Sequence, residues 1–316
     1  MSPWCGQDRE IHVQEVALRD GLQSEAGFVP TENKIALVHR LAASGLRKIE
    51  VTSFVSPRAV PQLADAEAVF QGITRRPGVI YAALAPNVRG MERAIAARAD
   101  EVNLVMSASE SHNRANLRMS GDASFQAIKE VGALAATAGM RVAASLSCSF
   151  GCPFEGEIPA AMILRWCRRL QEEAGIHSIN LCDTTGMAYP ALVHELVGLV
   201  RRSYPAANLA LHFHNTRGLG LANVFAGLDA GVIHFDAALA GIGGCPYAPG
   251  ATGNICTEDL IHALEVSGYR CGVDLDALIA TAGDFEKLLG HATPGQVMKA
   301  GRRLRGHLAD QHGPAA

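Results

Sequence analysis

The sequence predicts a (β/α)8 TIM barrel, an α/β fold in which eight parallel strands alternate with helices. Short apolar, β-branched runs recur along the chain, separated by longer segments with the 3.6-residue period of amphipathic helices. Strict alternation of this kind favours a parallel sheet, and eight strands can close that sheet into a barrel. An open, doubly wound sheet is the alternative. The predicted strands are residues 11–17, 48–53, 79–84, 101–106, 142–146, 178–181, 209–213 and 233–239.

The expected domain organisation is a single catalytic domain over residues 1–316. Residues 31–44 and 190–203 show clear helical periodicity, and no linker rich in proline, serine or charge divides the chain. A chain of 316 residues with 48% hydrophobic content can bury one large core, and barrels commonly reach this length as one domain. We expect the barrel over about residues 10–255 and additional C-terminal helices over about residues 256–316.

Composition argues against several other classes of protein. The formal net charge is −3 and charged residues make up only 19%, so no broad basic surface for nucleic acid is expected. Charges such as Arg141 and Asp229 interrupt the apolar stretches, so no membrane span is expected. The eight cysteines include no C-x-x-C pair, which argues against a zinc ribbon. Residues 1–10 have no apolar signal core, so we expect a cytoplasmic protein.

Polar residues cluster where the predicted strands end, and barrel enzymes place their chemistry at that position. His212 and His214 lie two residues apart at the end of the seventh predicted strand, so both point to the same face. With the Asp20 carboxylate they would form a mixed N/O site that suits Mg²⁺ or Mn²⁺ and does not exclude Zn²⁺ or Fe²⁺. The alternative is a hydrogen-bonded histidine pair without an ion. We interpret His234 and Asp236 as structural, because that pair begins inside the eighth strand.

Two further signals lie in the predicted loops. Arg19 precedes Asp20, and in a loop its guanidinium can reach a substrate oxyanion. The glycine-rich run 241–244 leads to Cys245, and it does not match the G-x-G-x-x-G nucleotide motif because Pro246 takes the sixth position. A thiol on a flexible loop at a barrel mouth suggests a mobile acid, base or nucleophile. A buried, unreactive thiol is the alternative.

Together these residues resemble the 3-hydroxy-3-methylglutaryl-CoA (HMG-CoA) lyase family, the metal-dependent lyase branch of the TIM-barrel Claisen and aldol enzymes. The resemblance runs from about Val13 to about Ala263. Related synthases share the Arg-Asp-Gly and His-x-His elements, and the Gly-Gly-Cys-Pro-Tyr loop indicates the lyase branch. The matching stretches are residues 15–23, 53–57, 60–62, 151–156, 183–186, 212–214 and 241–254.

The resemblance implies a set of functional residues and a divalent metal cofactor, Mg²⁺ or Mn²⁺. For Glu50, pairing with Arg19 is a structural alternative to a direct chemical role. The implied metal ligands are Asp20, His212, His214 and Asn254. The implied catalytic residues are Arg19, Asp20, Glu50, Asp183, His212 and Cys245.

The implied activity is the metal-dependent retro-Claisen cleavage of HMG-CoA to acetyl-CoA and acetoacetate. An ion on the tertiary alcohol lowers the pKa of that hydroxyl, and Arg19 matches the arginine that stabilises the thioester enolate. Cys245 then protonates the enolate carbon. Asp20 or His212 could assist the first deprotonation. The expected partner is an acyl-CoA substrate, with no nucleic acid or membrane, and we expect a homo-oligomer, a dimer or tetramer.

Alternatives remain at the level of substrate and reaction. One is a lyase for a related branched 3-hydroxyacyl-CoA, of the citramalyl or isoprenoid-derived glutaryl type, and another is an aldol- or Claisen-type synthase. A metal- or CoA-binding barrel without catalysis is disfavoured by the full set of ligands and the thiol. Arg217 stands where the family often has an aromatic residue. It could pair with a substrate carboxylate or be an ordinary surface charge.

Overall fold

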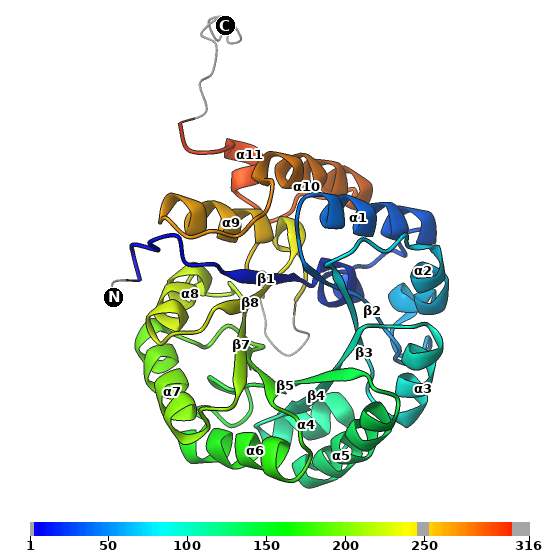
Figure 1. The fold of residues 1–316 in the computed structure, drawn as a ribbon, viewed down its shortest axis with the longest axis vertical. Helices are drawn as coiled ribbons and strands as arrows, with labels where there is room; N and C mark the ends of the chain where they lie inside the picture. Colours follow the sequence, from blue (N-terminus) through cyan, green and yellow to red (C-terminus); the bar gives the residue numbers. More distant parts are fainter. Residues whose placement is uncertain (1–2, 245–252, 305–316) are drawn as a thin grey trace, which may run out of the picture.

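The computed structural model describes residues 3–244 and 253–304, and it contains a closed barrel of eight parallel strands (Figure 1). The strands follow one another around the barrel in chain order, and the eighth pairs with the first. The predicted (β/α)8 barrel is therefore confirmed, and the open sheet is wrong. The strands are β1 (His12–Glu15), β2 (Lys48–Ser53), β3 (Ile80–Leu84), β4 (Glu101–Ser107), β5 (Arg141–Ser147), β6 (Ser178–Asp183), β7 (Asn208–Phe213) and β8 (His234–Ala237).

All eight predicted strands are present, and three of them end two residues away from the prediction: β6 runs on to Asp183 where residue 181 was expected, and two others stop early. The first was predicted to continue to residue 17, but β1 ends at Glu15 because the chain turns into a short π-helix, η1 (Ala17–Gly21). The eighth was predicted to reach residue 239, but β8 ends at Ala237 and a short 3-10 turn, η4 (Leu239–Gly241), follows. Both turns lie at the end of the barrel where the candidate site forms.

Helices between the strands surround the barrel (Figure 1). Two predicted helical segments, 31–44 and 190–203, match α1 and α7. The helices are α1 (Thr31–Ala43), α2 (Ala66–Gly72), α3 (Val88–Ala96), α4 (Glu110–Leu117), α5 (Gly121–Thr137), α6 (Ala160–Glu172), α7 (Pro190–Ser203) and α8 (Gly220–Asp229). Short 3-10 turns are η2 (Leu22–Ser24) and η3 (Pro61–Leu63).

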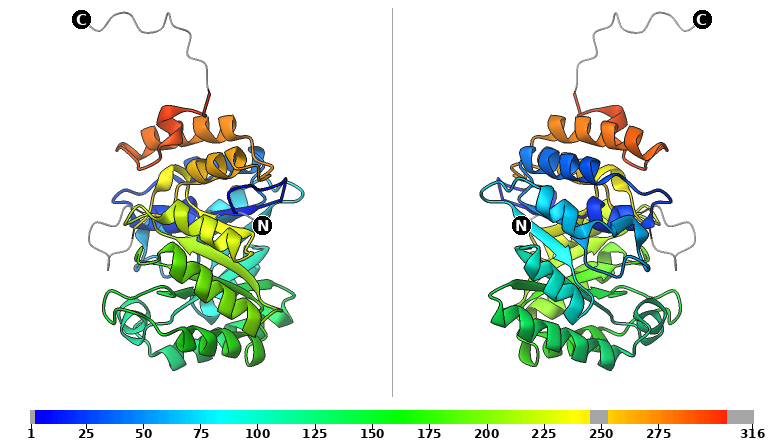
Figure 2. Two further views of the ribbon diagram at one scale, coloured as in Figure 1. Left: turned by 90° about the vertical axis from the view of Figure 1, so that its left-hand side faces the viewer. Right: turned by 90° about the vertical axis from the view of Figure 1, so that its right-hand side faces the viewer.

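The C-terminal helices are α9 (Thr257–Val266), α10 (Leu275–Leu289) and α11 (Val297–Ala300). Figures 1 and 2 show them packed along one side of the barrel, near α1. Arg40 of α1 and Asp284 of α10 form an ion pair at 3.0 Å across this contact. The single domain and its boundary near residue 255 stay predictions. Among the described residues no helix has both the length and the apolar composition needed to cross a bilayer.

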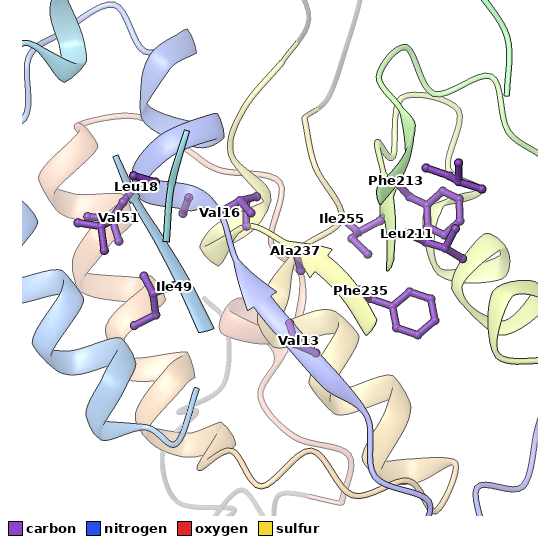
Figure 3. Close-up of a cluster of buried hydrophobic side chains, with 14 of the residues drawn as sticks. Val13, Val16, Leu18, Ile49, Val51, Leu211, Phe213, Phe235, Ala237 and Ile255 are labelled. Atoms are coloured by element: carbon purple, nitrogen blue, oxygen red, sulfur yellow. The ribbon is translucent and has the colours of Figure 1, made fainter. Parts of the chain in front are cut away.

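Apolar and polar side chains alternate along the strands, so the two faces of the sheet differ. Figure 3 shows buried side chains from β1, β2, β7 and β8, among them Ile49, Val51 and Phe235. Each fully buried side chain of this size stabilises the fold by about 1.5–3 kcal/mol. Because successive side chains on a strand point to opposite faces, Glu50 between Ile49 and Val51 points the other way. That other face is the inside of the barrel.

Five polar residues, which we call the interior polar layer, occupy the inside of the barrel: Glu50, Asn103, Ser145, Asn180 and Asp236. Asn103 Nδ2 on β4 donates to Glu50 Oε1 on β2 at 3.2 Å, and Asn180 Nδ2 on β6 donates to Asp236 Oδ2 on β8 at 2.6 Å. These bonds join strands that are not neighbours in the sheet, so they cross the interior. Ser145 Oγ donates to Asn103 Oδ1 at 3.0 Å. The interior polar layer therefore lies inside the barrel, beneath the C-terminal ends of the strands.

Candidate active site

The first functional segment is η1, all of whose residues are buried. Short π-helical turns often occur at functional sites because they re-aim side chains without ending an element. One Glu15 oxygen accepts hydrogen bonds from the backbone N–H of Ala17, at 2.8 Å, and of Leu239, at 2.9 Å. The carboxylate of β1 thus joins the start of η1 to the chain that leaves β8. This brings the predicted residues Arg19 and Asp20 to the same end of the barrel as the segment that leads to Cys245.

Arg19 lies between two carboxylates. Its Nε donates to Glu50 Oε2 and its Nη1 to Asp20 Oδ1, each at 2.5 Å. Burial lowers the pKa of Arg19, but Glu50 and Asp20 outweigh this effect and raise it above its ordinary value. The guanidinium is therefore charged and fixed in direction. Its ion pairs with Glu50 and Asp20 use Nε and Nη1. Glu50 is thus paired with Arg19, as the structural alternative predicted.

Three predicted metal ligands converge above the interior polar layer. The Nε2 atoms of His212 and His214 are 3.1 Å apart, and Asp20 Oδ2 lies 3.9 Å and 3.7 Å from them, respectively. All three side chains are buried, and their candidate ligand atoms lie within 4.8 Å of one another. Two histidines and one carboxylate in such an arrangement can hold a divalent ion and leave positions open for substrate. Their role as ligands stays a prediction.

The end of β7 places the two histidines. His212 lies within β7, and His214 follows it by two residues, so both rings face the interior, as the spacing predicted. A returning segment fixes this arrangement: His214 bridges to Asn254, and Ile255 N donates to Phe213 O at 3.1 Å. Asn254, a predicted ligand that follows the glycine-rich loop in sequence, therefore lies beside His214 in space.

The charge states of Asp20 and His214 suit a cation. Burial raises the pKa of Asp20, but the Arg19 guanidinium and the two histidines outweigh it and hold that pKa well below its usual range. Burial lowers the pKa of His214, so that imidazole is neutral near pH 7. An ionised carboxylate and a neutral imidazole are the forms that bind metals.

Asn254 provides a test of whether the residues fit a metal ion. Its Nδ2 donates to Asp20 Oδ2 at 2.9 Å and to Ile242 O at 3.0 Å. Its Oδ1 is buried and accepts no hydrogen bond within the described part of the chain. A buried carbonyl oxygen without a partner is costly, and an ion among these side chains would give it one. The donor set of one carboxylate, one amide and two imidazoles fits a divalent cation such as Mg²⁺ or Mn²⁺.

Asp183 is the last residue of β6. This strand pairs with β7, and the residue before Asp183, Cys182, lies opposite His212. The side chain of Asp183 holds the loop that follows. Its Oδ1 accepts from the backbone N–H of Met187 at 2.7 Å and of Ala188 at 3.1 Å, which holds the loop after β6. Burial raises the pKa of Asp183 to about 6. Its Oδ2 is buried and has no hydrogen-bond partner among residues 3–244 and 253–304. Asp183 therefore uses Oδ1 to hold the loop after β6, while Oδ2 is available to accept a hydrogen bond or a proton.

Cys245 lies outside the described residues, so its predicted role stays a prediction. The chain that leads to it packs against the site. Gly243 has a φ of +114°, and a Cβ there would lie 2.5 Å from Asn254 Nδ2 and 3.4 Å from Asp20 O. Only glycine fits this conformation and this close approach. Cys152, which lies in the matching stretch 151–156, is buried and its thiol donates to Ser109 Oγ at 2.9 Å.

Sequence reasoning missed the contribution of Asp236. We interpreted His234 and Asp236 together as structural, but Asp236 Oδ2 lies 3.2 Å from His212 Nδ1. The signal in the sequence was the same two-residue spacing that identified His212 and His214, applied to the neighbouring strand. Asn180, which donates to the same Asp236 oxygen, had no signal of its own.

Arg217 contacts protein backbone at the barrel mouth. Its Nη1 donates to the carbonyl oxygens of Thr185, at 3.1 Å, and Gly186, at 2.7 Å, and so connects the loops after β6 and β7. We expect Arg217→Leu to change the KM for HMG-CoA less than about threefold, because this guanidinium is already engaged by the protein. Steady-state kinetics test this. A KM raised about tenfold or more would instead show a charge pair with the substrate.

The comparison that decides the family is a match of the HMGL-like family model to residues 10–284. The chain belongs to the HMGL-like family. Curated HMGL-like relatives include a hydroxymethylglutaryl-CoA lyase of Bacillus subtilis, 42% identical over 90% of this chain and 95% of that protein. A mitochondrial hydroxymethylglutaryl-CoA lyase of Gallus gallus is 42% identical over 94% of this chain and 99% of that protein.

Solved HMGL-like structures agree with the fold. An HMG-CoA lyase from Acinetobacter baumannii, solved with coenzyme A and 3-methylmalate, superimposes with a TM-score of 0.90. It is 48% identical, and the match covers 94% of this chain and 97% of that one. The HMG-CoA lyase of Bacillus subtilis also gives a TM-score of 0.90 at 41% identity, over 93% of this chain and 99% of that one.

Proposed function

We propose that this protein is a metal-dependent carbon–carbon lyase that cleaves HMG-CoA to acetyl-CoA and acetoacetate. The observation that carries this proposal is the convergence of Asp20, His212 and His214 beside the fixed Arg19 guanidinium, in a chain of the HMGL-like family. A cation site next to a charged, directed arginine suits a reaction that forms an alkoxide at one carbon and an enolate at the next.

The metal site would be formed by Asp20, His212, His214 and Asn254. When bound, a divalent ion lowers the pKa of the substrate hydroxyl and so favours its deprotonation. The buried carboxylate of Asp20 stays ionised across the neutral range because Arg19 lies beside it. Asn254 Oδ1 is buried and lacks a partner within the described chain. These features support the proposed ligand set.

Arg19 stabilises the negative charge that forms on the thioester oxygen. Glu50 and Asp20 hold its Nε and Nη1, so the guanidinium needs no reorganisation when the charge appears. Glu50 is fully buried and acts through Arg19, which makes it a positioning residue in this account. Cys245 donates a proton to the enolate carbon, which releases acetyl-CoA.

Asp183 is the best-suited acceptor of the hydroxyl proton, because Asp20 and His212 are metal ligands in this account. Its Oδ2 has no partner within the described chain, and burial sets its pKa at about 6, so it is ionised near pH 7. Asp183→Asn should lower kcat about 100-fold or more while KM changes less than about threefold. Steady-state kinetics measure both constants. A change confined to KM would contradict a role in proton transfer.

A screen of substrates tests which acyl group the protein accepts in its acyl-CoA substrate. The relative from Acinetobacter baumannii was solved with coenzyme A and a branched hydroxy diacid, 3-methylmalate, so branched 3-hydroxyacyl-CoA substrates form a natural series. Branched 3-hydroxyacyl-CoAs are incubated with the protein and Mg²⁺ or Mn²⁺, and the products are identified by mass. HMG-CoA should have the highest kcat/KM. A citramalyl- or isoprenoid-derived thioester that reacts at least about tenfold better would replace HMG-CoA as the proposed substrate.

Two further expectations remain proposals. We propose an acyl-CoA as the small-molecule partner and a homo-oligomer, a dimer or a tetramer, as the assembly. Light scattering of the purified protein gives the subunit number, and a monomer at micromolar concentration would contradict the assembly. The cytoplasmic location stays a prediction.

A further inference from the structure

We propose that Asp236 is a positioning residue for the metal site, which fixes the tautomer of His212 and supplies negative charge that retains the ion. This inference rests on the proposed metal-dependent function. Asp236 lies in β8, one strand from His212, and its side chain is part of the interior polar layer. It is buried, with a relative exposure of 4%.

One oxygen of Asp236 holds two side chains. Its Oδ2 accepts from Asn180 Nδ2 at 2.6 Å and faces His212 Nδ1 at 3.2 Å. Asn180 comes from β6, which does not pair with β8, and His212 comes from the adjacent β7, so the carboxylate of β8 is bonded to side chains of two other strands. The position of Asp236 is therefore determined by the barrel itself, and His212 has a fixed partner on the side away from Asp20.

The contact determines which imidazole nitrogen carries the proton. An ionised carboxylate only accepts hydrogen bonds, so His212 Nδ1 must donate to it. In the neutral ring the Nε2 atom then carries the lone pair, and Nε2 is the atom that faces His214 and Asp20. A carboxylate that bonds the non-ligating nitrogen of a histidine fixes ring orientation and raises ligand basicity.

The place of Asp236 among the buried charges also suits a cation. Asp20, Glu50 and Asp236 are three buried carboxylates, and Arg19 pairs with the first two. Asp236 has no contact with Arg19 among these ion pairs and faces His212 instead. Negative charge close to a cation site favours the bound ion.

A cavity reaches Asp236 from the other end of the barrel. A cavity of about 410 Å³ opens among the N-terminal ends of the strands and extends to Asn103, Asn180 and Asp236. This cavity lies at the end of the barrel opposite to the candidate site. Asp236 therefore lies between this cavity and the candidate metal site.

The test measures Mn²⁺ binding directly by titration calorimetry and by the EPR signal of free Mn²⁺. Asp236→Asn, which keeps the size of the side chain, should raise the Kd for Mn²⁺ about 10- to 100-fold. Glu101→Gln is the matched control, because Glu101 is a carboxylate at the other end of the barrel interior, paired with Lys48. The control should bind Mn²⁺ as the original protein does. Equal Kd values for Asp236→Asn and the control would overturn the inference.

A second readout separates positioning from ordinary structural support. Saturating Mn²⁺ should raise the Tm of Asp236→Asn less than it raises the Tm of the original protein, because the variant binds the ion more weakly. A lower Tm in EDTA together with an unchanged Kd would show a structural role and overturn the inference. If the original protein itself binds no Mn²⁺, the proposed metal site is wrong, which is a different result.

A further variant tests the effect of Asp236 on metal binding if Asp236→Asn fails to fold. Asn180→Ala removes the other hydrogen-bond donor to Asp236 and leaves every proposed ligand in place. It should weaken Mn²⁺ binding about threefold or more, since Asp236 is then less firmly held. An unchanged Kd in this variant would contradict the inference independently.

Discussion

His214→Ala should lose all measurable cleavage of HMG-CoA and bind Mn²⁺ at least about 100-fold more weakly than the original protein. His214 Nε2 lies 3.1 Å from His212 Nε2 and 3.7 Å from Asp20 Oδ2, so its removal opens the cluster. Because its pKa is lowered, the imidazole is neutral and its lone pair is available near pH 7. The loss should therefore appear in metal affinity as well as in kcat.

His234→Ala is the matched control for that variant. His234 begins β8 at the opposite end of the barrel, where it stacks on His12 with ring centroids 4.8 Å apart. Its own pKa is lowered to about 4 by burial and by the nearby His12, so it too is neutral near pH 7. We expect kcat and the Kd for Mn²⁺ of this variant to stay within about threefold of the original values. Equal losses in the two variants would contradict a specific metal role for His214.

Cys245→Ser should keep the fold and bind substrate, yet lower kcat about 10³-fold or more. A serine hydroxyl is nearly the size of the thiol but far less acidic, so it cannot deliver the proton to the enolate carbon at the same rate. Circular dichroism and the KM for HMG-CoA check folding and binding. If kcat stays within about tenfold of the original, the thiol is structural and the proposed proton donor is wrong.

Alkylation gives an independent test of the same thiol. Cys5 is exposed, and the described cysteines other than Cys5 and Cys271 are buried. Cys5→Ser is therefore the suitable background, because it removes an alternative target of the reagent without touching the site. In this background iodoacetamide should inactivate the enzyme, and bound substrate should slow the loss. Full activity after stoichiometric alkylation of Cys245 would contradict its catalytic role.

The strands could be predicted because their apolar runs alternate regularly with longer segments that have the periodicity of helices. The pair His212 and His214 could be predicted because side chains two apart on a strand share a face. The end of β1 could not be predicted, since no local signal distinguishes a strand that continues to Ala17 from a π-helix that begins there. That turn is fixed by Glu15, which bonds Ala17 and the distant Leu239.

The interior polar layer also escaped prediction. Asn103, Ser145 and Asn180 are single polar residues within strands, and their partners lie on strands far away in sequence. Only the closed barrel shows that side chains of β6 and β8, which are not neighbours in the sheet, meet in its interior. The same holds for Asp236, whose contact with His212 depends on the parallel register of β7 and β8, in which His212 pairs with Asp236. Long-range register of this kind is a tertiary property.

The central claim is that a divalent ion held by Asp20, His212 and His214 is required for cleavage of HMG-CoA. The most direct measurement follows acetyl-CoA by mass spectrometry after the protein has been dialysed exhaustively against chelator. We predict no acetyl-CoA above the uncatalysed background from the metal-free protein, and full release once Mg²⁺ or Mn²⁺ is added back. The same rate of release before and after metal addition, with metal content verified as zero, would contradict the account.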